Sequence, residues 1–241
     1  MVNRFVSKLK VFAELSVEDI AAITHATAKV RSVTSRTDLI REGDRPGPVF
    51  VMIDGWAIRY KILPNGSRQV MAFLMPGDAC DLHVGMLAEM DHSIATTTQA
   101  RVATIGRDEM DRMFDKHPNI AKAMYIAQLT DEGTLRAWIT SMGRRSSMER
   151  VAHLMCELYL RARMIGLVDT PEFELPLSQV ILADALGMTP VHINRVLKDL
   201  RLMGAMVLKR GSLTILDPNK LVTVAGFDEN YLHRKLRSLE S

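Results

Sequence analysis

The 241-residue sequence contains only two cysteines, Cys80 and Cys156, and no Cys-x-x-Cys pair. Two cysteines so far apart cannot form a disulfide framework, so we expect a reduced, cytoplasmic setting. No apolar run approaches the ~20 residues of a membrane helix, and we therefore predict no membrane partner. The first residues, MVNRFVSKLKVF, also lack the long apolar segment of a secretory signal.

The motifs of several enzyme classes are absent as well. The sequence has no glycine-rich phosphate loop, no cluster with metal-ligand spacing and no nucleophile elbow. We therefore predict a protein without catalytic residues or a bound metal. The net charge of +3 excludes no class of binding partner. The 47% of hydrophobic residues are enough for a folded core, and the length is enough for two compact domains.

Glycines recur in the first half of the chain, and the residues between them have the pattern of strands. The runs are PVFVMID, WAIRYKIL and RQVMAFL, and the sequence PNGS joins the last two as a turn, because Asn and Gly tolerate positive φ. The later runs SIATTTQA and RVATIG extend the pattern. Short strands separated by turns predict an antiparallel sandwich or jelly roll. An unrelated α+β domain is the alternative.

A helical pattern follows Pro118 and continues from Asn119 to about Gly143, with Gly133 as its one internal interruption. Such a helix would be about 36 Å long, more than one small domain usually covers, which favours a dimerisation helix. Packing on its own β domain is a second role that another face of the helix can serve. The interface positions that we predict are Ala127, Leu135, Trp138 and Met142.

The residues after this helix predict a hinge at 143–146, with Ser147 as N-cap of the next helix. Two short helices then surround Gly187 in the stretch ILADALGMTPVHINRVLKDLR. Ser178 is the expected N-cap of the first helix and Gly187 its end, while Thr189 and Pro190 begin the second. A short helix, a glycine turn and a second helix are typical of a helix-turn-helix.

The second helix has one apolar face and one face suited to DNA. Placing residues at 100° steps puts Val191, Arg195 and Lys198 opposite the apolar residues, with His192 and Asn194 on the flanks. Two strand-like runs then flank Arg210-Gly211 and predict a hairpin with a basic tip, which is a wing. Residues 189–210 contain five Lys or Arg and one acid, a charge pattern that attracts phosphates. The predicted DNA-binding residues are Thr189, Val191, His192, Asn194, Arg195, Lys198, Lys209 and Arg210.

Nearly the whole chain resembles the Crp/Fnr family of bacterial transcription regulators. The motifs that carry the resemblance are LIREGD before VFVMIDGWAIRY, then PGDACDL, and finally LADALGMTPVHINRVLKDLR, while CDLHV and EMDHSIAT resemble the FixK-like branch. The resemblance implies an α+β chain, with a cyclic-nucleotide-binding-like jelly roll (1–118), a dimerisation helix and hinge (119–145) and a winged helix-turn-helix (146–241). It also implies a homodimer that reads an inverted repeat in double-stranded DNA and contacts RNA polymerase.

The expected effector pocket departs from the family pattern. Cyclic-nucleotide binders of this family hold the ligand with a Gly-Glu pair and a later Arg-Ser pair, where this chain has Cys80-Asp81 and His92-Ser93. Asp81 is one methylene shorter than glutamate, and Cys80 has a side chain where a glycine lets the ligand approach. His92 carries full charge only below about pH 6.5, unlike an arginine. We therefore predict that cyclic AMP does not control this protein.

The sequence also bears on two other cofactors of the family, the iron–sulfur cluster and haem. The oxygen-sensing branch binds an iron–sulfur cluster through four thiolates, which two distant cysteines cannot supply, so we predict no cluster. Haem stays open, because no spacing distinguishes among the candidate ligands His25, His83, His92, His117 and His153. We interpret Cys156 as a small buried hydrophobe in preference to a redox-sensitive thiol.

The sequence leaves two questions about recognition open. The jelly roll either binds a small molecule other than a cyclic nucleotide or serves only as a dimer scaffold. Many relatives carry a base-reading glutamate where this chain has Val191, which cannot accept a hydrogen bond from cytosine N4. We therefore expect an operator that differs from the commonest half-site of the family.

Overall fold

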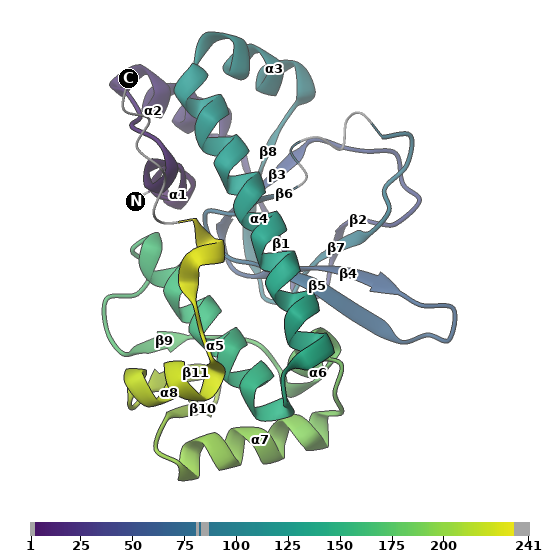
Figure 1. Ribbon diagram of the computed structural model, residues 1–241. Helices are drawn as coiled ribbons and strands as arrows, with labels where there is room; N and C mark the ends of the chain where they lie inside the picture. Colours follow the sequence, from purple (N-terminus) through teal and green to yellow (C-terminus); the bar gives the residue numbers. More distant parts are fainter. Residues whose placement is uncertain (1–2, 81, 83–86, 234–241) are drawn as a thin grey trace.

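The computed structural model describes residues 3–80, 82 and 87–233, and Figure 1 shows their arrangement. The N-terminal half contains two four-stranded antiparallel sheets, in the orders β1-β8-β3-β6 and β2-β7-β4-β5. This architecture confirms the predicted jelly roll. Its strands are β1 (Val30–Val33), β2 (Asp38–Ile40), β3 (Val49–Asp54), β4 (Ala57–Ile62), β5 (Arg68–Leu74), β6 (Ala79–Cys80), β7 (Ser93–Thr96) and β8 (Ala100–Ile105).

Turn chemistry fixes the register of these strands. The PNGS turn joins β4 to β5, whose pairing runs from Ile62 opposite Arg68 to Ala57 opposite Leu74. Gly55, between β3 and β4, has φ +79°, and a Cβ there would lie 2.4 Å from the carbonyl oxygen of Gln99. Only glycine fits this close approach. The space between the sheets is filled by buried apolar side chains, including Met52, Leu74, Cys80, Met90, Ile94 and Val102.

Three helices that the sequence did not predict cover one end of the β domain: α1 (Arg4–Phe12), α2 (Val17–Ala26) and α3 (Arg107–Lys116). Ser16 caps α2 through a capping box with Asp19. The helix α1 packs against α4 and β3. The buried residues of this second core include Phe5, Leu9, Phe12, Ile23, Met110 and Ile120.

The helix α4 (Pro118–Arg144) confirms the predicted long helix and runs from the β domain to the C-terminal domain (Figure 1). Gly133 lies inside it, where a Cβ would approach the carbonyl oxygen of Tyr231 to 2.5 Å. The prediction of Ser147 as the next N-cap was wrong by one residue. Ser146 caps α5, because Glu149 lies three residues after it and the two form a capping box.

The C-terminal domain contains α5 (Ser147–Met164), the two short helices α6 (Gln179–Leu186) and α7 (Pro190–Leu202), and a three-stranded sheet in the order β10-β11-β9. The remaining elements are β9 (Glu172–Glu174), β10 (Met206–Lys209), β11 (Ser212–Ile215), α8 (Pro218–Ala225) and η2 (Glu229–Leu232). One apolar core continues from this domain into the β domain, and it includes Ile58, Phe73, Trp138, Leu158 and Leu182. Among the described helices, none combines the length and apolar character needed to cross a membrane.

Candidate nucleic-acid interface

The predicted helix-turn-helix is present, with the caps at the predicted residues. The Ser178 hydroxyl accepts a hydrogen bond from the amide of Ile181 at 3.2 Å at the start of α6. Gly187 ends α6 in the left-handed region with φ 62°. The Thr189 hydroxyl accepts from the amide of His192 at 3.2 Å, and Pro190 is the first residue of α7. Local sequence therefore determines both helix ends.

The two faces of α7 separate as the predicted periodicity requires. The apolar face is buried and consists of Ile193, Val196, Leu197 and Leu200. On the opposite face Arg195 and Lys198 are exposed, and Val191 is 82% exposed. Asn194 is exposed and His192 half-buried. The helix lies at the end of the molecule far from α3 and the N-terminal helices (Figure 1), so this face is available to a large partner.

The predicted wing is also present. Lys209 pairs with Ser212 at the end of the β10–β11 hairpin. Arg210 and Gly211 form its tip, with φ of 52° and 78°, the conformation of a tight turn that matches strand twist. The sequence reasoning missed β9, which pairs with β11 on its other side. The Ser212 hydroxyl donates to Glu172 of that strand at 2.7 Å, so the wing is anchored at its base.

The charges of this surface are available for a ligand. Five exposed cations lie on α7 and the wing: Arg195, Lys198, Arg201, Lys209 and Arg210. None of the five makes an ion pair with another residue in the described part of the chain. Their positive potential is therefore not neutralised within the chain, as expected for a phosphate-binding surface.

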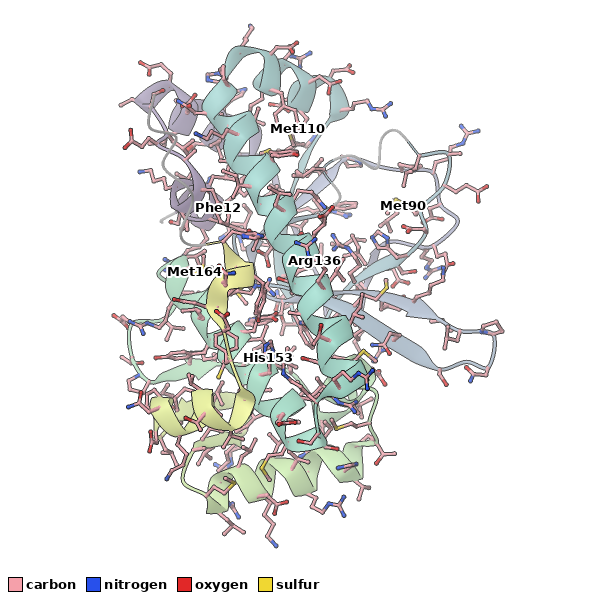
Figure 2. All side chains as sticks on the ribbon, viewed as in Figure 1. Phe12, Met90, Met110, Arg136, His153 and Met164 are labelled. Carbon is pink, nitrogen blue, oxygen red and sulfur yellow. The ribbon has the colours of Figure 1, made fainter. Side chains whose placement is uncertain are left out.

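Three of the four predicted effector-pocket residues, Cys80, His92 and Ser93, lie in the described part of the chain. Cys80 is fully buried in the apolar core of the β domain. His92 is 8% exposed, and its Nδ1 lies 2.6 Å from Oδ1 of Asp91, a hydrogen bond that lowers the pKa of the Asp91 carboxyl. The buried Ser93 hydroxyl accepts from the amide of Glu42 at 2.9 Å. Asp81 lies outside the described residues. Figure 2 labels Met90 among the side chains of this region.

The candidate haem ligands that the structure describes lie on different elements and do not gather at one point. The exposed His25 is on α2, and His117 at the start of α4 has its Nδ1 2.8 Å from Oδ1 of Asp19. His153, labelled in Figure 2, is buried on α5. Its ring stacks on that of Tyr231. His83 lies outside the described residues. Within those residues no group of three or more His, Cys, Asp or Glu is placed to hold a metal ion.

Cys156 has the environment of a structural thiol. It is 7% exposed, and burial raises its pKa to about 12. Because the thiolate is the reactive form, this cysteine has low reactivity near neutral pH. The interpretation of Cys156 as a small hydrophobe fits this environment.

One of the four predicted interface residues of α4, Trp138, needs correction, and the other three stay predictions. Trp138 is buried within its own chain, packs against Phe73 and donates its indole N–H to Glu157. Ala127 is half-buried against the core formed by the N-terminal helices. Leu135 and Met142 are exposed in the single chain, as expected of residues that a partner chain would cover. The sequence reasoning missed Tyr125 and Ile139, which are 64% and 71% exposed; a full helical projection of α4 would have placed both with Leu135.

Comparison with known proteins follows this division of the chain. Residues 30–117 match the cyclic nucleotide-binding domain and residues 149–224 match the Crp-like helix-turn-helix domain. The nitrogen fixation regulation protein FixK of Bradyrhizobium diazoefficiens is 24% identical over 216 residues, 89% of each chain. The transcriptional activator protein FnrL of Cereibacter sphaeroides is 24% identical over 206 residues, 83% of this chain and 82% of FnrL.

A solved structure supports the same fold. The structure of FixK2 from Bradyrhizobium japonicum superposes with a TM-score of 0.71 at 21% identity, and it covers 81% of this chain and 96% of FixK2. At this identity the likeness establishes the fold and the arrangement of domains alone.

Proposed function

The chain belongs to the Crp/Fnr family of transcription regulators, and we propose that it is a homodimeric, sequence-specific transcriptional activator that does not respond to cyclic AMP. The observation that carries the proposal is the outward face of α7 beside the basic wing, with five exposed cations that no described residue neutralises. This arrangement supplies a helix for the major groove and a separate phosphate contact.

The dimer in this proposal forms along an apolar stripe on α4. Its exposed apolar residues are Tyr125, Leu129, Leu135, Ile139 and Met142. Glu132 and Arg136, which form an exposed ion pair at 3.1 Å, lie within the same stripe, and Figure 2 labels Arg136 on this helix. Exposed apolar residues at helical spacing are typical of a helix–helix seam. Pairing two chains along α4 also supplies the two-fold symmetry that an inverted-repeat operator requires.

Arg195 is the residue to which we assign base recognition. It projects from the N-terminal half of α7, the part of a recognition helix that reaches base edges. A guanidinium can donate two hydrogen bonds to guanine O6 and N7, which contributes about 1–3 kcal/mol of discrimination. Lys209, at the edge of the wing tip, is assigned a phosphate contact. Val191 offers only apolar contact, such as that with a thymine methyl group.

Activation is proposed through contact with RNA polymerase, in line with the name of the relative FnrL, a transcriptional activator protein. The proposed lack of a response to cyclic AMP rests on the residues of the effector pocket. His92 is engaged with Asp91 and the Ser93 hydroxyl with the backbone of Glu42, so neither offers a fixed cation or an unengaged hydroxyl to a cyclic phosphate.

The selection of binding sites from random DNA tests the proposal. The unmodified protein should enrich one inverted-repeat motif, because a symmetric dimer presents two copies of α7. Arg195→Ala should flatten the preference at one base pair of each half-site and weaken binding by about 1–3 kcal/mol per half-site. If the two proteins select the same motif with equal sharpness, Arg195 does not read a base. If the unmodified protein enriches no motif, sequence-specific binding itself is refuted.

A further inference from the structure

A chain of buried charged groups crosses the boundary between the β domain and the C-terminal domain. Asp78, in the turn between β5 and β6, lies 2.6 Å from Nζ of Lys8 on α1 and 2.9 Å from Nη2 of Arg161 on α5. Arg161 also donates from Nη2 to the carbonyl oxygen of Phe73 on β5 at 2.9 Å. One carboxylate therefore joins three elements that are distant in sequence.

The same arginine leads to a second buried carboxylate. Nη1 of Arg161 lies 3.5 Å from Oε1 of Glu157, one turn earlier on α5. Oε2 of Glu157 accepts from the indole N–H of Trp138 on α4 and from the hydroxyl of Tyr231 in η2, each at 3.0 Å. The four ionisable side chains, Lys8, Asp78, Glu157 and Arg161, form what we call the interdomain network.

The interdomain network is shielded from water. The side chains of Asp78 and Glu157 are 6% and 0% exposed, and those of Lys8 and Arg161 are each 16% exposed. Burial alone would raise the pKa of Asp78, but Lys8 and Arg161 outweigh it and the pKa of this carboxyl is lowered. For Glu157, burial dominates and raises the pKa of the carboxyl.

Such a network is better suited to fixing an orientation than to strengthening a contact. The desolvation of buried ion pairs can cancel their attraction, so apolar residues would hold two domains together at least as well. A buried charge that loses its partner is strongly disfavoured, however. A rotation that moves α5 away from the β5–β6 turn separates Arg161 from Asp78, and one that moves α5 away from α4 separates Glu157 from Trp138. The contacts are therefore all satisfied in one orientation of the C-terminal domain.

We propose that the interdomain network is a latch that holds the C-terminal domain in its DNA-competent orientation without a bound effector. This inference rests on the proposed DNA-binding function. In the orientation that the network fixes, α7 and the wing lie on the outside of the molecule, at its far end from the N-terminal helices (Figure 1). A second interdomain contact, in which Arg68 of β5 pairs with Asp184 of α6 at 2.7 Å, lies on a more exposed part of the boundary and supports the same orientation.

The test measures orientation and DNA binding on the full-length protein. Dyes are attached at Arg112→Cys on α3 and Asn219→Cys on α8, both exposed positions, while Cys80 and Cys156 are buried and react slowly. Labelled chains are mixed with excess unlabelled protein, so that each measured distance lies within one chain. The DNA probe is the sequence that the unmodified protein selects from random DNA.

The variants are Asp78→Asn, which keeps an oxygen for the amide of Met75, and Arg161→Met, which removes the cation that reaches Asp78 across the boundary. Each should broaden the distance distribution and weaken DNA binding roughly 5- to 150-fold, the usual range of coupling between sites. Together they should weaken binding less than the product of their separate effects, because they break the same pair. The matched control is Met110→Ala, a buried position of α3 away from the boundary, which should lower thermal stability and leave distance and affinity unchanged.

The latch is refuted if both variants keep the distance distribution and the affinity of the unmodified protein, if the distribution broadens without loss of affinity, or if affinity increases. Should Asp78→Asn fail to fold, Arg161→Met decides, because Lys8 still neutralises Asp78 in that variant. An unmodified protein that binds no selected DNA refutes the proposed function instead, and the distance measurement still decides whether the interdomain network fixes the orientation.

Discussion

Trp138 on α4 donates its indole N–H to Oε2 of Glu157 on α5 at 3.0 Å, whereas the next residue, Ile139, points outward and is 71% exposed. Two adjacent apolar residues of one helix thus have opposite roles. Trp138 joins the two domains of its own chain, and Ile139 is left without an intramolecular contact that would bury it. The proposed dimer seam therefore contains Ile139 and excludes Trp138.

Substitutions at these two positions should have different effects. Ile139→Glu should weaken dimer association by about 2 kcal/mol or more, because a charge replaces a central apolar residue of the seam. Analytical ultracentrifugation measures the dissociation constant. The control, Val17→Glu, changes a 78% exposed residue of α2 and should leave the dimer intact. Trp138→Phe should lower the free energy of unfolding by about 1–3 kcal/mol without shifting association; a dimer that survives Ile139→Glu contradicts the seam.

Lys209→Ala should weaken binding to all DNA sequences about equally. Its side chain is assigned to a phosphate, so its loss should lower the slope of log affinity against log salt concentration by roughly one unit per contact. Fluorescence titrations at several salt concentrations measure the slope. Lys116→Ala, at an exposed position of α3 distant from the wing, serves as the control. A loss confined to the selected operator would show that Lys209 reads sequence.

Two glycines of α4 should respond to alanine with opposite signs. A Cβ at Gly133 would lie 2.5 Å from the carbonyl oxygen of Tyr231, so Gly133→Ala must displace η2 and should destabilise the fold by about 1–3 kcal/mol. No atom lies within 4 Å of a Cβ at Gly143. Gly143→Ala should stabilise the helix by about 0.5–1 kcal/mol. Chemical denaturation measures the free energy of unfolding of both variants. Equal changes of the same sign would contradict the steric role of Gly133.

His153 makes stability depend on pH below neutrality. Burial lowers its pKa from 6.5 to about 4, with a smaller effect of Arg145. Between pH 6.5 and pH 4 the unfolded chain binds a proton on His153 that the folded chain does not. The contribution of the buried neutral imidazole to the free energy of unfolding is therefore complete above pH 6.5 and is lost as the pH falls toward 4. The loss is on the order of 2–3 kcal/mol. Denaturation at several pH values measures the free energy of unfolding, which should fall more steeply toward acid pH for the unmodified protein than for His153→Gln. Parallel pH dependences of the two proteins would contradict this role of His153.

Millimolar cyclic AMP should neither release heat in calorimetry nor change DNA affinity. The reason is the absence of a fixed guanidinium at His92 and the internal contact of Ser93 with Glu42. A cyclic-AMP-binding relative provides the positive control. A micromolar dissociation constant, about −8 kcal/mol, would show that another cation holds the cyclic phosphate.

The sequence by itself determined the features that depend on neighbours in the chain. Gly187, Thr189 and Pro190 set the turn between the two short helices, because a left-handed glycine, a capping hydroxyl and a first-turn proline act locally. The buried and exposed faces of α7 followed from helical periodicity, and the β10–β11 hairpin from Arg210-Gly211. One of the family motifs, LADALGMTPVHINRVLKDLR, lies in these same local patterns.

The tertiary structure decided what depends on residues distant in sequence. The sequence periodicity of α4 placed Trp138 on an apolar face but could not tell whether a partner or α5 covers that face, and Glu157 settles the matter. The contacts of Asp78 with Lys8 and Arg161 join residues 70 and 83 positions away. No local pattern predicts which buried charges meet, because their pairing is set by how the two domains pack.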